Sequence, residues 1–195
     1  MNTPAHLILN VALATGGGRT ELARPALLGA LLPDLPMFLF FLWERGVAGT
    51  PDAILWNEIY FQAGWQDFFD VFNSIPLALL GLALAHRARS RAGLALFASM
   101  LLHHGFDLAL HHDDAHRHFL PFSDLRVTSP VSYWDPRHHG AWAALGELGI
   151  VTAGAVVLAR RYGSAWLRAL LAACVLLQAW GWLAFYRLGL FGPDF

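Results

Sequence analysis

Five long apolar stretches dominate this 195-residue chain and limit what it can fold into. They cover residues 25–43, 71–85, 92–110, 141–159 and 169–186. A helix needs about 20 mostly apolar residues to cross the hydrocarbon core of a bilayer. The second stretch is short, but it reaches that length if it is extended backward through Phe68 and Phe69. The pattern therefore predicts helices that cross a membrane.

The composition agrees with that prediction. Hydrophobic residues make up 56% of the chain and charged residues only 14%, whereas about a quarter of the residues in soluble domains are charged. We predict a single all-α domain over residues 1–195, built as a polytopic membrane helix bundle with four to five spanning helices. Residues 4–14 are too few to span, so they predict a partial N-terminal helix that ends at the glycines 16–18.

The charge and cysteine content exclude other classes of protein. A net charge of −1 gives no indication of nucleic acid as a partner. The single Cys174 excludes an internal disulfide and a cysteine-based metal site. The first residues lack the charged stretch of a signal peptide.

Arginine gathers in three short segments between the apolar stretches. They hold Arg19 and Arg24, then Arg87, Arg89 and Arg91, then Arg160, Arg161 and Arg168. Cytoplasmic loops of membrane proteins carry an excess of basic residues, so alternating spans predict that all three segments are cytoplasmic. The long connections 44–70 and 111–140 then share the opposite side.

The segment LLHHGFDLALHHDDAHRHF, residues 101–119, gathers six of the ten histidines at the end of an apolar helix. At 100° per residue, His103, His104, Asp107 and His111 share an arc of about 100°, whereas His112 lies opposite unless the helix has ended. Spacings of four residues let one helix face present imidazole and carboxylate groups to a common ion. We therefore predict that this face points into the bundle and binds a divalent metal.

Imidazole and carboxylate ligands favour Zn²⁺, with Mn²⁺ or Fe²⁺ as alternatives, over Ca²⁺ or Mg²⁺. Two other interpretations remain open from the residues. The histidines can form a polar helix end that reaches the lipid headgroups. They can also ligate haem, for which only His6 and His86 offer a second axial ligand near the ends of other helices.

Asp34 is the second strong candidate. It lies near the middle of a span, between Pro33 and Pro36. An acid at membrane depth is expensive and is a functional hypothesis by default. We predict that Asp34 comes within reach of the histidine face, as a metal ligand or as a catalytic base. The alternative is that it only caps the helix that follows.

Polar residues at the starts of other helices are further candidates. Asp70 opens one span, and Asn73 and Ser74 follow one turn later, so the three can share the site; alternatively Asp70 is only a helix cap. His6 and Asn10 are i, i+4 neighbours on the first helix and form a polar stripe on an apolar surface.

The loop at residues 123–140 supplies the last candidates. His138 and His139 precede the fourth span, and on a helix His139 lies about 80° from Glu147 while His138 lies about 180° away. His139 is therefore the predicted additional metal ligand. Arg126 and Arg137 can hold a phosphate through their planar guanidinium groups, or they can contact lipid headgroups.

Several of these motifs together resemble a known family. His6, GALLPD at residues 29–34, the Asp/Asn/Ser cluster at 70–74 and HHGFD at 103–107 resemble the YdjM-like group of inner-membrane metal-dependent hydrolases. More distantly, His103-x3-Asp107 is similar to the helix motif of zinc-dependent phospholipase C and P1-type nucleases. That superfamily is all-helical and binds up to three zinc ions. The resemblance covers roughly residues 6–139.

The resemblance implies a role for each matching residue. His103 and Asp107 would bind metal, with Asp107 bridging two ions, and His6 would be an N-terminal ligand. Asp34 would be a ligand or the base for an attacking water. By the same resemblance, one to three ions would be bound.

These expectations lead to a hypothesis about function. By the resemblance, His111 or His112 would bind a second ion. A metal-activated water would hydrolyse a phosphoester of a small molecule or membrane lipid. The expected location is a bacterial-type inner membrane, with the site on the non-cytoplasmic side. The alternatives are a non-catalytic metal-binding or metal-transport protein, and a structural or partner-binding protein whose site has decayed. Polar groups are rare toward the arginine-rich side, which favours a closed site over a transport path.

Overall fold

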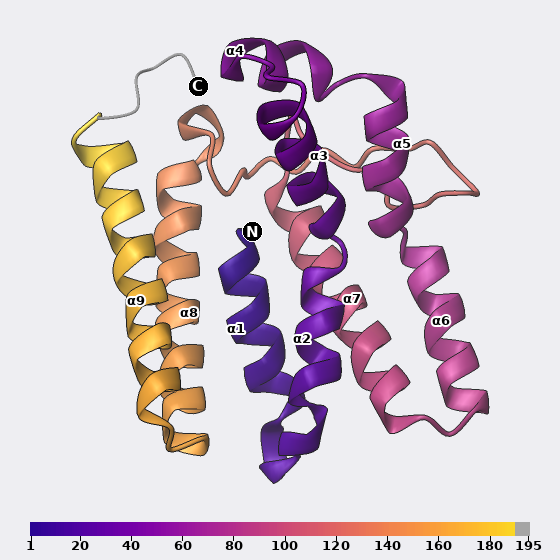
Figure 1. Cartoon of the computed structure of the whole chain (residues 1–195), viewed down its shortest axis with the longest axis vertical. Helices are drawn as coiled ribbons and strands as arrows, with labels where there is room; N and C mark the ends of the chain where they lie inside the picture. The colour runs from indigo at the N-terminus through magenta and orange to yellow at the C-terminus, as the bar shows by residue number, and fades with distance from the viewer. Residues whose placement is uncertain (190–195) are drawn as a thin grey trace.

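The computed structural model describes residues 1–189, which form helices joined by loops, with no strand among them (Figure 1). The longer helices are α1 (Thr3–Ala14), α2 (Ala23–Leu31), α3 (Leu35–Gly46), α5 (Ala63–Phe72), α6 (Ile75–Arg87), α7 (Arg91–Leu110), α8 (Gly140–Arg161) and α9 (Ala165–Trp182). The short elements are α4 (Asp52–Ile54), 3₁₀ turns at Gly16–Gly18, Thr20–Leu22 and Pro136–His138, and π-helical turns at Leu55–Ile59 and Leu183–Arg187.

Four helical segments in this part of the chain are long and apolar enough to cross a membrane. They are Ala63–Arg87, Arg91–Leu110, Gly140–Arg161 and Ala165–Arg187, and the bent pair Thr20–Leu31 with Leu35–Gly46 makes a fifth if it is one span. This confirms the predicted all-α bundle of four to five spans with a short N-terminal helix. The fold is compatible with a multi-pass membrane protein. The predicted span 71–85 proves longer, because α5 precedes α6 after a break of two residues.

The arginine-rich connections lie together at one end of the bundle. Figure 1 shows the turns between α1 and α2, α6 and α7, and α8 and α9 at its lower end. Ser90 and Ser164 end two of these turns, and their hydroxyls accept hydrogen bonds from the backbone N–H groups of Gly93 (3.1 Å) and Leu167 (3.3 Å). Such serine caps satisfy N–H groups that lack a helical partner, so they fix where α7 and α9 begin.

Helix α1 covers only part of the bundle's height, and the chain begins midway along the bundle (Figure 1). Asn2 caps α1 by accepting a hydrogen bond from the Ala5 N–H at 3.1 Å. Gly154 of α8 allows close packing against α1, since a Cβ there would lie 3.0 Å from the side chain of Ile8. This packing holds His6 fully buried inside the bundle.

Helices α2 and α3 are bent by 52° where the sequence has two prolines around Asp34. Pro33 and Pro36 have no N–H group, so they cannot complete the helical hydrogen bonds across this region. The chain makes tighter turns instead, with Asp34 N–H bonded to Leu31 O at 3.1 Å and Leu35 N–H bonded to Leu32 O at 3.3 Å. The break frees Asp34 from a regular helix and turns it toward α7.

Close contact between α2 and α7 fixes the distance from Asp34 to the histidines. A Cβ at Gly29 would lie 2.1 Å from the carbonyl oxygen of Leu96, closer than real contacts allow. The hydroxyl of Ser99 in α7 donates a hydrogen bond of 2.6 Å to the carbonyl of Ala26, and Asn10 of α1 donates to the Ser99 hydroxyl at 2.9 Å. Three helices are therefore joined at Ser99, and α2 and α7 approach most closely at Gly29.

Gly29→Ala is therefore expected to separate α2 from α7 and lower the free energy of unfolding by roughly 1–3 kcal/mol, as overpacked sites do. Gly105→Ala is the matched control, because it lies in α7 with nothing within 4 Å of the added Cβ. The control should be neutral or more stable by up to about 1 kcal/mol. Denaturant unfolding in detergent compares the two, and equal destabilisation would show that the close approach at Gly29 is unimportant.

An aromatic cluster covers the end of the bundle opposite the arginine-rich turns. Phe40, Leu55, Tyr60 and Phe69 are buried there, and the Phe40 ring packs edge-on against Trp65 with centroids 5.0 Å apart. Aromatic side chains are typical of the membrane–water boundary. The cluster ties the 44–70 connection to α3 and α5, and so positions Asp70.

Candidate metal centre

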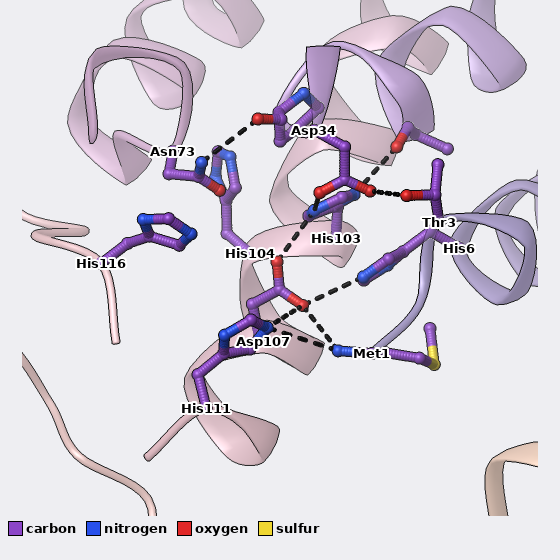
Figure 2. Close-up of polar contacts among 12 residues, drawn as sticks. Met1, Thr3, His6, Asp34, Asn73, His103, His104, Asp107, His111 and His116 are labelled. Carbon is purple, nitrogen blue, oxygen red and sulfur yellow. Dashed lines mark hydrogen bonds and ion pairs between the residues drawn. The ribbon is translucent and has the colours of Figure 1, made fainter. Parts of the chain in front are cut away.

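Asp107 lies at the centre of the buried polar site (Figure 2). It is 2% exposed. Its Oδ2 is 2.8 Å from His103 Nε2, and its Oδ1 is 3.0 Å from His6 Nε2 and 3.4 Å from His111 Nε2. The Met1 amine also donates a hydrogen bond of 3.0 Å to Oδ1. The predicted inward orientation of His103, Asp107 and His111 is confirmed.

The orientation of His103 is set by the backbone of α2. Its Nδ1 is 2.8 Å from the carbonyl oxygen of Ala30, which only accepts hydrogen bonds, so Nδ1 carries the proton. Its Nε2 faces Asp107 and also Asp34 Oδ1, which is 3.4 Å away. Either a proton on Nε2 or a metal cation between these groups would balance the two carboxylates. Donation of the second ring nitrogen to a carbonyl is typical of metal-binding histidines.

His6, His103 and Asp107 form a group that can hold a metal ion. One ligand atom from each lies within 4.8 Å of the others, and all three residues are buried. The His6 and His103 rings are stacked, with centroids 3.5 Å apart and an interplanar angle of 10°. Two protonated rings at this distance would repel strongly, so the stacking favours at least one neutral imidazole, the form that binds metals.

Asp34 faces this group, as predicted. Its Oδ2 accepts a hydrogen bond of 2.6 Å from the Thr3 hydroxyl, which leaves Oδ1 toward His103. It precedes α3, but its side chain makes no capping hydrogen bond. The Asp34 side chain is 24% exposed, whereas that of Asp107 is 3% exposed. Asp34 is thus the more accessible of the two carboxylates.

A second group of imidazoles continues from the first. His104 Nε2 lies 3.2 Å from the Phe72 carbonyl and His118 Nδ1 lies 2.9 Å from the Asn73 carbonyl, so these nitrogens are the donors. The remaining nitrogens, His104 Nδ1 and His118 Nε2, are buried and have no hydrogen-bond partner among the described residues. Burial lowers the pKa of His118 to about 4, so its ring is neutral at neutral pH.

His111 and His116 each bind a carboxylate through Nδ1. His111 Nδ1 is 3.1 Å from Asp114 Oδ2, and His116 Nδ1 is 3.1 Å from Asp70 Oδ1. Although burial opposes the charged form, the neighbouring His111 imidazole holds the pKa of Asp114 below its usual value. Carboxylates in such positions fix the orientation and tautomer of an imidazole.

Asp70 does not join His6, His103 and Asp107, which differs from the predicted shared site. Besides His116, it accepts hydrogen bonds from Arg117 Nε at 2.5 Å and Arg126 at 3.1 Å. Two guanidinium groups neutralise the carboxylate, so its role is to position His116. Arg126, predicted to hold phosphate, is engaged by the same ion pair and by the carbonyl of Ala115.

Asn73 and Ser74 also have structural partners. Asn73 donates hydrogen bonds to the carbonyls of Pro33 (3.2 Å) and Phe69 (3.1 Å), and its Oδ1 is left without a partner among the described residues. Ser74 caps α6 and donates to the Leu120 carbonyl at 2.5 Å. Only Asn73 keeps a free acceptor near the second group of imidazoles.

The residues at the start of α8 lie differently from the prediction. His139 has a left-handed backbone with φ of 62°, and no hydrogen bond or ion pair joins it to the centre within the part of the chain that the structure describes. The helical geometry assumed for it does not apply, because α8 begins one residue later. Its neighbour His138 stacks on His112 with centroids 3.6 Å apart, and Asp135 binds both His138 and Arg137.

Four residues of the site were not among the predicted ligands: Thr3, Asp114, His116 and His118. Three of them lie in an irregular loop after α7, where helical periodicity gives no information. The density of histidines in residues 101–119 was the available signal.

No protein-family model, no curated protein and no solved structure matches this chain.

Proposed function

We propose that this protein is a multi-pass membrane hydrolase that uses a divalent metal to cleave a phosphoester. The observation that carries the proposal is the orientation of His103. Its Nδ1 donates to a backbone carbonyl, and its Nε2 faces two carboxylates inside an apolar bundle. A divalent cation at this point would balance both carboxylates and take up the Nε2 lone pair, which supports a metal site.

His6, His103 and Asp107 would hold the ion, and Zn²⁺ suits these ligands best, with Mn²⁺ or Fe²⁺ as alternatives. When bound, such an ion lowers the pKa of water toward about 7 and polarises a phosphoryl oxygen. His104 and His118 offer two further lone pairs for a second ion. These residues suit one or two ions, and the resemblance extends the proposal to one to three.

Asp34 is the proposed general base. It is near enough to His103 to face the metal site, and it is more exposed than Asp107, so water and substrate can reach it. The Thr3 hydroxyl orients the carboxylate by donating to Oδ2. Oδ1 is then directed at the site and can accept a proton from the attacking water.

The substrate class rests on two supports. The pairing of His103 with Asp107 is similar to the helix motif of zinc-dependent phosphoester hydrolases. The site lies among apolar helices beside the first residue of the chain, which Figure 1 shows midway along the bundle, and such surroundings suit a substrate with an apolar part. A lipid or a small phosphorylated molecule is the proposed substrate, and the non-cytoplasmic side of a bacterial-type inner membrane is the proposed location.

Removal of the metal tests this proposal. Protein purified in detergent, stripped with a chelator and assayed on phosphomonoesters and phospholipids should be inactive, and Zn²⁺ or Mn²⁺ should restore hydrolysis. Stoichiometric metal without hydrolysis of any substrate would favour the alternative, a non-catalytic metal-binding or metal-transport protein. Hydrolysis that survives complete metal removal would contradict the proposal.

A further inference from the structure

A separate cavity lies between α8, α9 and the start of the chain. Its volume is about 250 Å³, and the residues that line it include Asn2, Glu147, Gln178, Trp134, Trp182 and Tyr186. None of these residues belongs to the proposed metal centre. The cavity combines one carboxylate and two amide side chains with a largely aromatic wall.

Glu147 is buried inside the spanning helix α8, with 4% of its surface exposed. Its Oε1 accepts hydrogen bonds from the Asn2 N–H at 3.2 Å and from Gln178 Nε2 at 2.9 Å. Its Oε2 has no hydrogen-bond partner, and Glu147 has no ion pair with any described residue. A carboxylate at membrane depth costs at least about 2.5–3.5 kcal/mol without compensation, so Glu147 needs a proton or a cationic partner.

Gln178 adds a second acceptor without a donor. Its Nε2 must face the Glu147 carboxylate, because the amide oxygen would be repelled there, so the assignment of the two amide atoms is fixed. Its Oε1 is consequently the free atom, and it has no partner among the described residues. Two unpartnered oxygens of adjoining side chains thus call for a ligand with at least two N–H or O–H donors.

The aromatic wall is held rigidly. Trp182 Nε1 donates to the Ala141 carbonyl at 2.9 Å, and the Tyr186 hydroxyl donates to the Trp134 carbonyl at 2.7 Å. The polar atoms of Trp182 and Tyr186 are therefore already hydrogen-bonded to the backbone, and their rings face the cavity mainly with carbon atoms. Aromatic rings attract cations, most strongly when the cation is removed from water.

We propose that this cavity binds a primary ammonium group. Its N–H groups would donate to Glu147 Oε2 and Gln178 Oε1, and its charge would be balanced by the carboxylate and the rings. A quaternary ammonium would satisfy the rings but has no N–H group for the two oxygens. A metal ion is disfavoured, because the wall supplies one carboxylate and few other ligands. The ligand is an aminophospholipid headgroup or a free primary amine.

The binding site is independent of the proposed hydrolysis, and binding can be measured without turnover. Isothermal calorimetry on the full chain in detergent should show that O-phosphoethanolamine binds at least tenfold more tightly than phosphocholine. Glu147→Gln should weaken O-phosphoethanolamine binding tenfold or more, because a charge-assisted hydrogen bond is lost. Glu44→Gln is the matched control: Glu44 is also a buried glutamate of an apolar helix, but it already accepts a hydrogen bond of 2.8 Å from Thr50.

A second arm distinguishes the two sources of the amine. Protein in nanodiscs of equal phosphatidylethanolamine and phosphatidylcholine is re-extracted, and the retained lipid is measured by mass spectrometry. Retention of phosphatidylethanolamine without binding of the soluble compound identifies the lipid, and binding of the soluble compound identifies a free amine as sufficient. Trp182→Phe should weaken either interaction, whereas Trp166→Phe, at a position of α9 that is 77% exposed, should not.

Any one of three results would overturn the proposal. They are equal affinity for phosphocholine and O-phosphoethanolamine, no binding of either amine source, and unchanged binding by Glu147→Gln. The thermal midpoint of each variant shows whether it is folded. Because binding needs no metal turnover, failure here leaves the proposed hydrolase untouched, and loss of hydrolysis leaves amine binding to be measured.

Discussion

Replacing Asp107 with alanine is expected to abolish both metal binding and hydrolysis. Asp107 contacts His6, His103 and His111, so its removal takes one ligand from the ion and the negative charge that balances it. Mutation of groups that merely support a ligand costs about 10–100-fold in metal affinity, so loss of the ligand itself should cost at least about 100-fold. Metal content by mass spectrometry after dialysis, beside phosphoester turnover, measures both effects.

Asp113→Ala is the control for this change. Asp113 belongs to the same acidic and histidine-rich segment, but its side chain is 55% exposed and its contacts are with His112 and Arg137. The control should keep its metal and its activity. If Asp107→Ala retains as much metal as Asp113→Ala, the central carboxylate is not a ligand.

The second large effect is expected from Asp34→Asn, which should lower turnover by about 10²–10⁴-fold while metal content stays near that of the unmodified protein. The amide keeps the size of the side chain and can still accept the Thr3 hydrogen bond, but it cannot take a proton from water. Turnover and metal content measured on the same sample separate the two roles. Asp52→Asn, at an exposed carboxylate on the same side of the bundle, should change neither.

A parallel fall in metal content and turnover would identify Asp34 as a ligand and not as the base. Unchanged turnover would remove Asp34 from the chemistry, and its contact with His103 would then be purely structural. The pair of variants therefore assigns separate roles to the two carboxylates that face His103.

The fold could be predicted because apolar length is a local property of the sequence. A run of about 20 apolar residues specifies a spanning helix whatever its neighbours are, and the predicted spans end within a few residues of α7 and α8. The partial helix before the glycines and the bend at Asp34 also follow from local rules for glycine and proline.

The site could be predicted only where helical periodicity applied. His103, Asp107 and His111 share one face of α7, and Asp34 was found because an acid within an apolar stretch needs a partner. The loop after α7 has no such periodicity, so His116 and His118 were missed. Asp70 forms ion pairs with Arg117 and Arg126, which lie 47 and 56 positions further along the sequence. No local pattern in the sequence contains such contacts.

His139 shows how one backbone angle changes a prediction. The expectation that it approaches the site assumed that it already belonged to the helix, but its left-handed conformation places it before the first turn of α8. Glu147, which was considered only in relation to His139, belongs instead to a cavity formed with Gln178, a residue of the next helix.

X-ray absorption at the metal K edge of the purified, Zn²⁺-loaded protein tests the metal centre. We expect a nitrogen and oxygen shell at about 2.0–2.1 Å, with the scattering pattern of at least two imidazoles. His6→Ala and His103→Ala should each remove an imidazole contribution, whereas His86→Ala, an exposed histidine at the far end of α6, should leave the spectrum unchanged. A shell of water oxygens alone, or a spectrum unaffected by His103→Ala, would contradict a metal centre built on His6, His103 and Asp107.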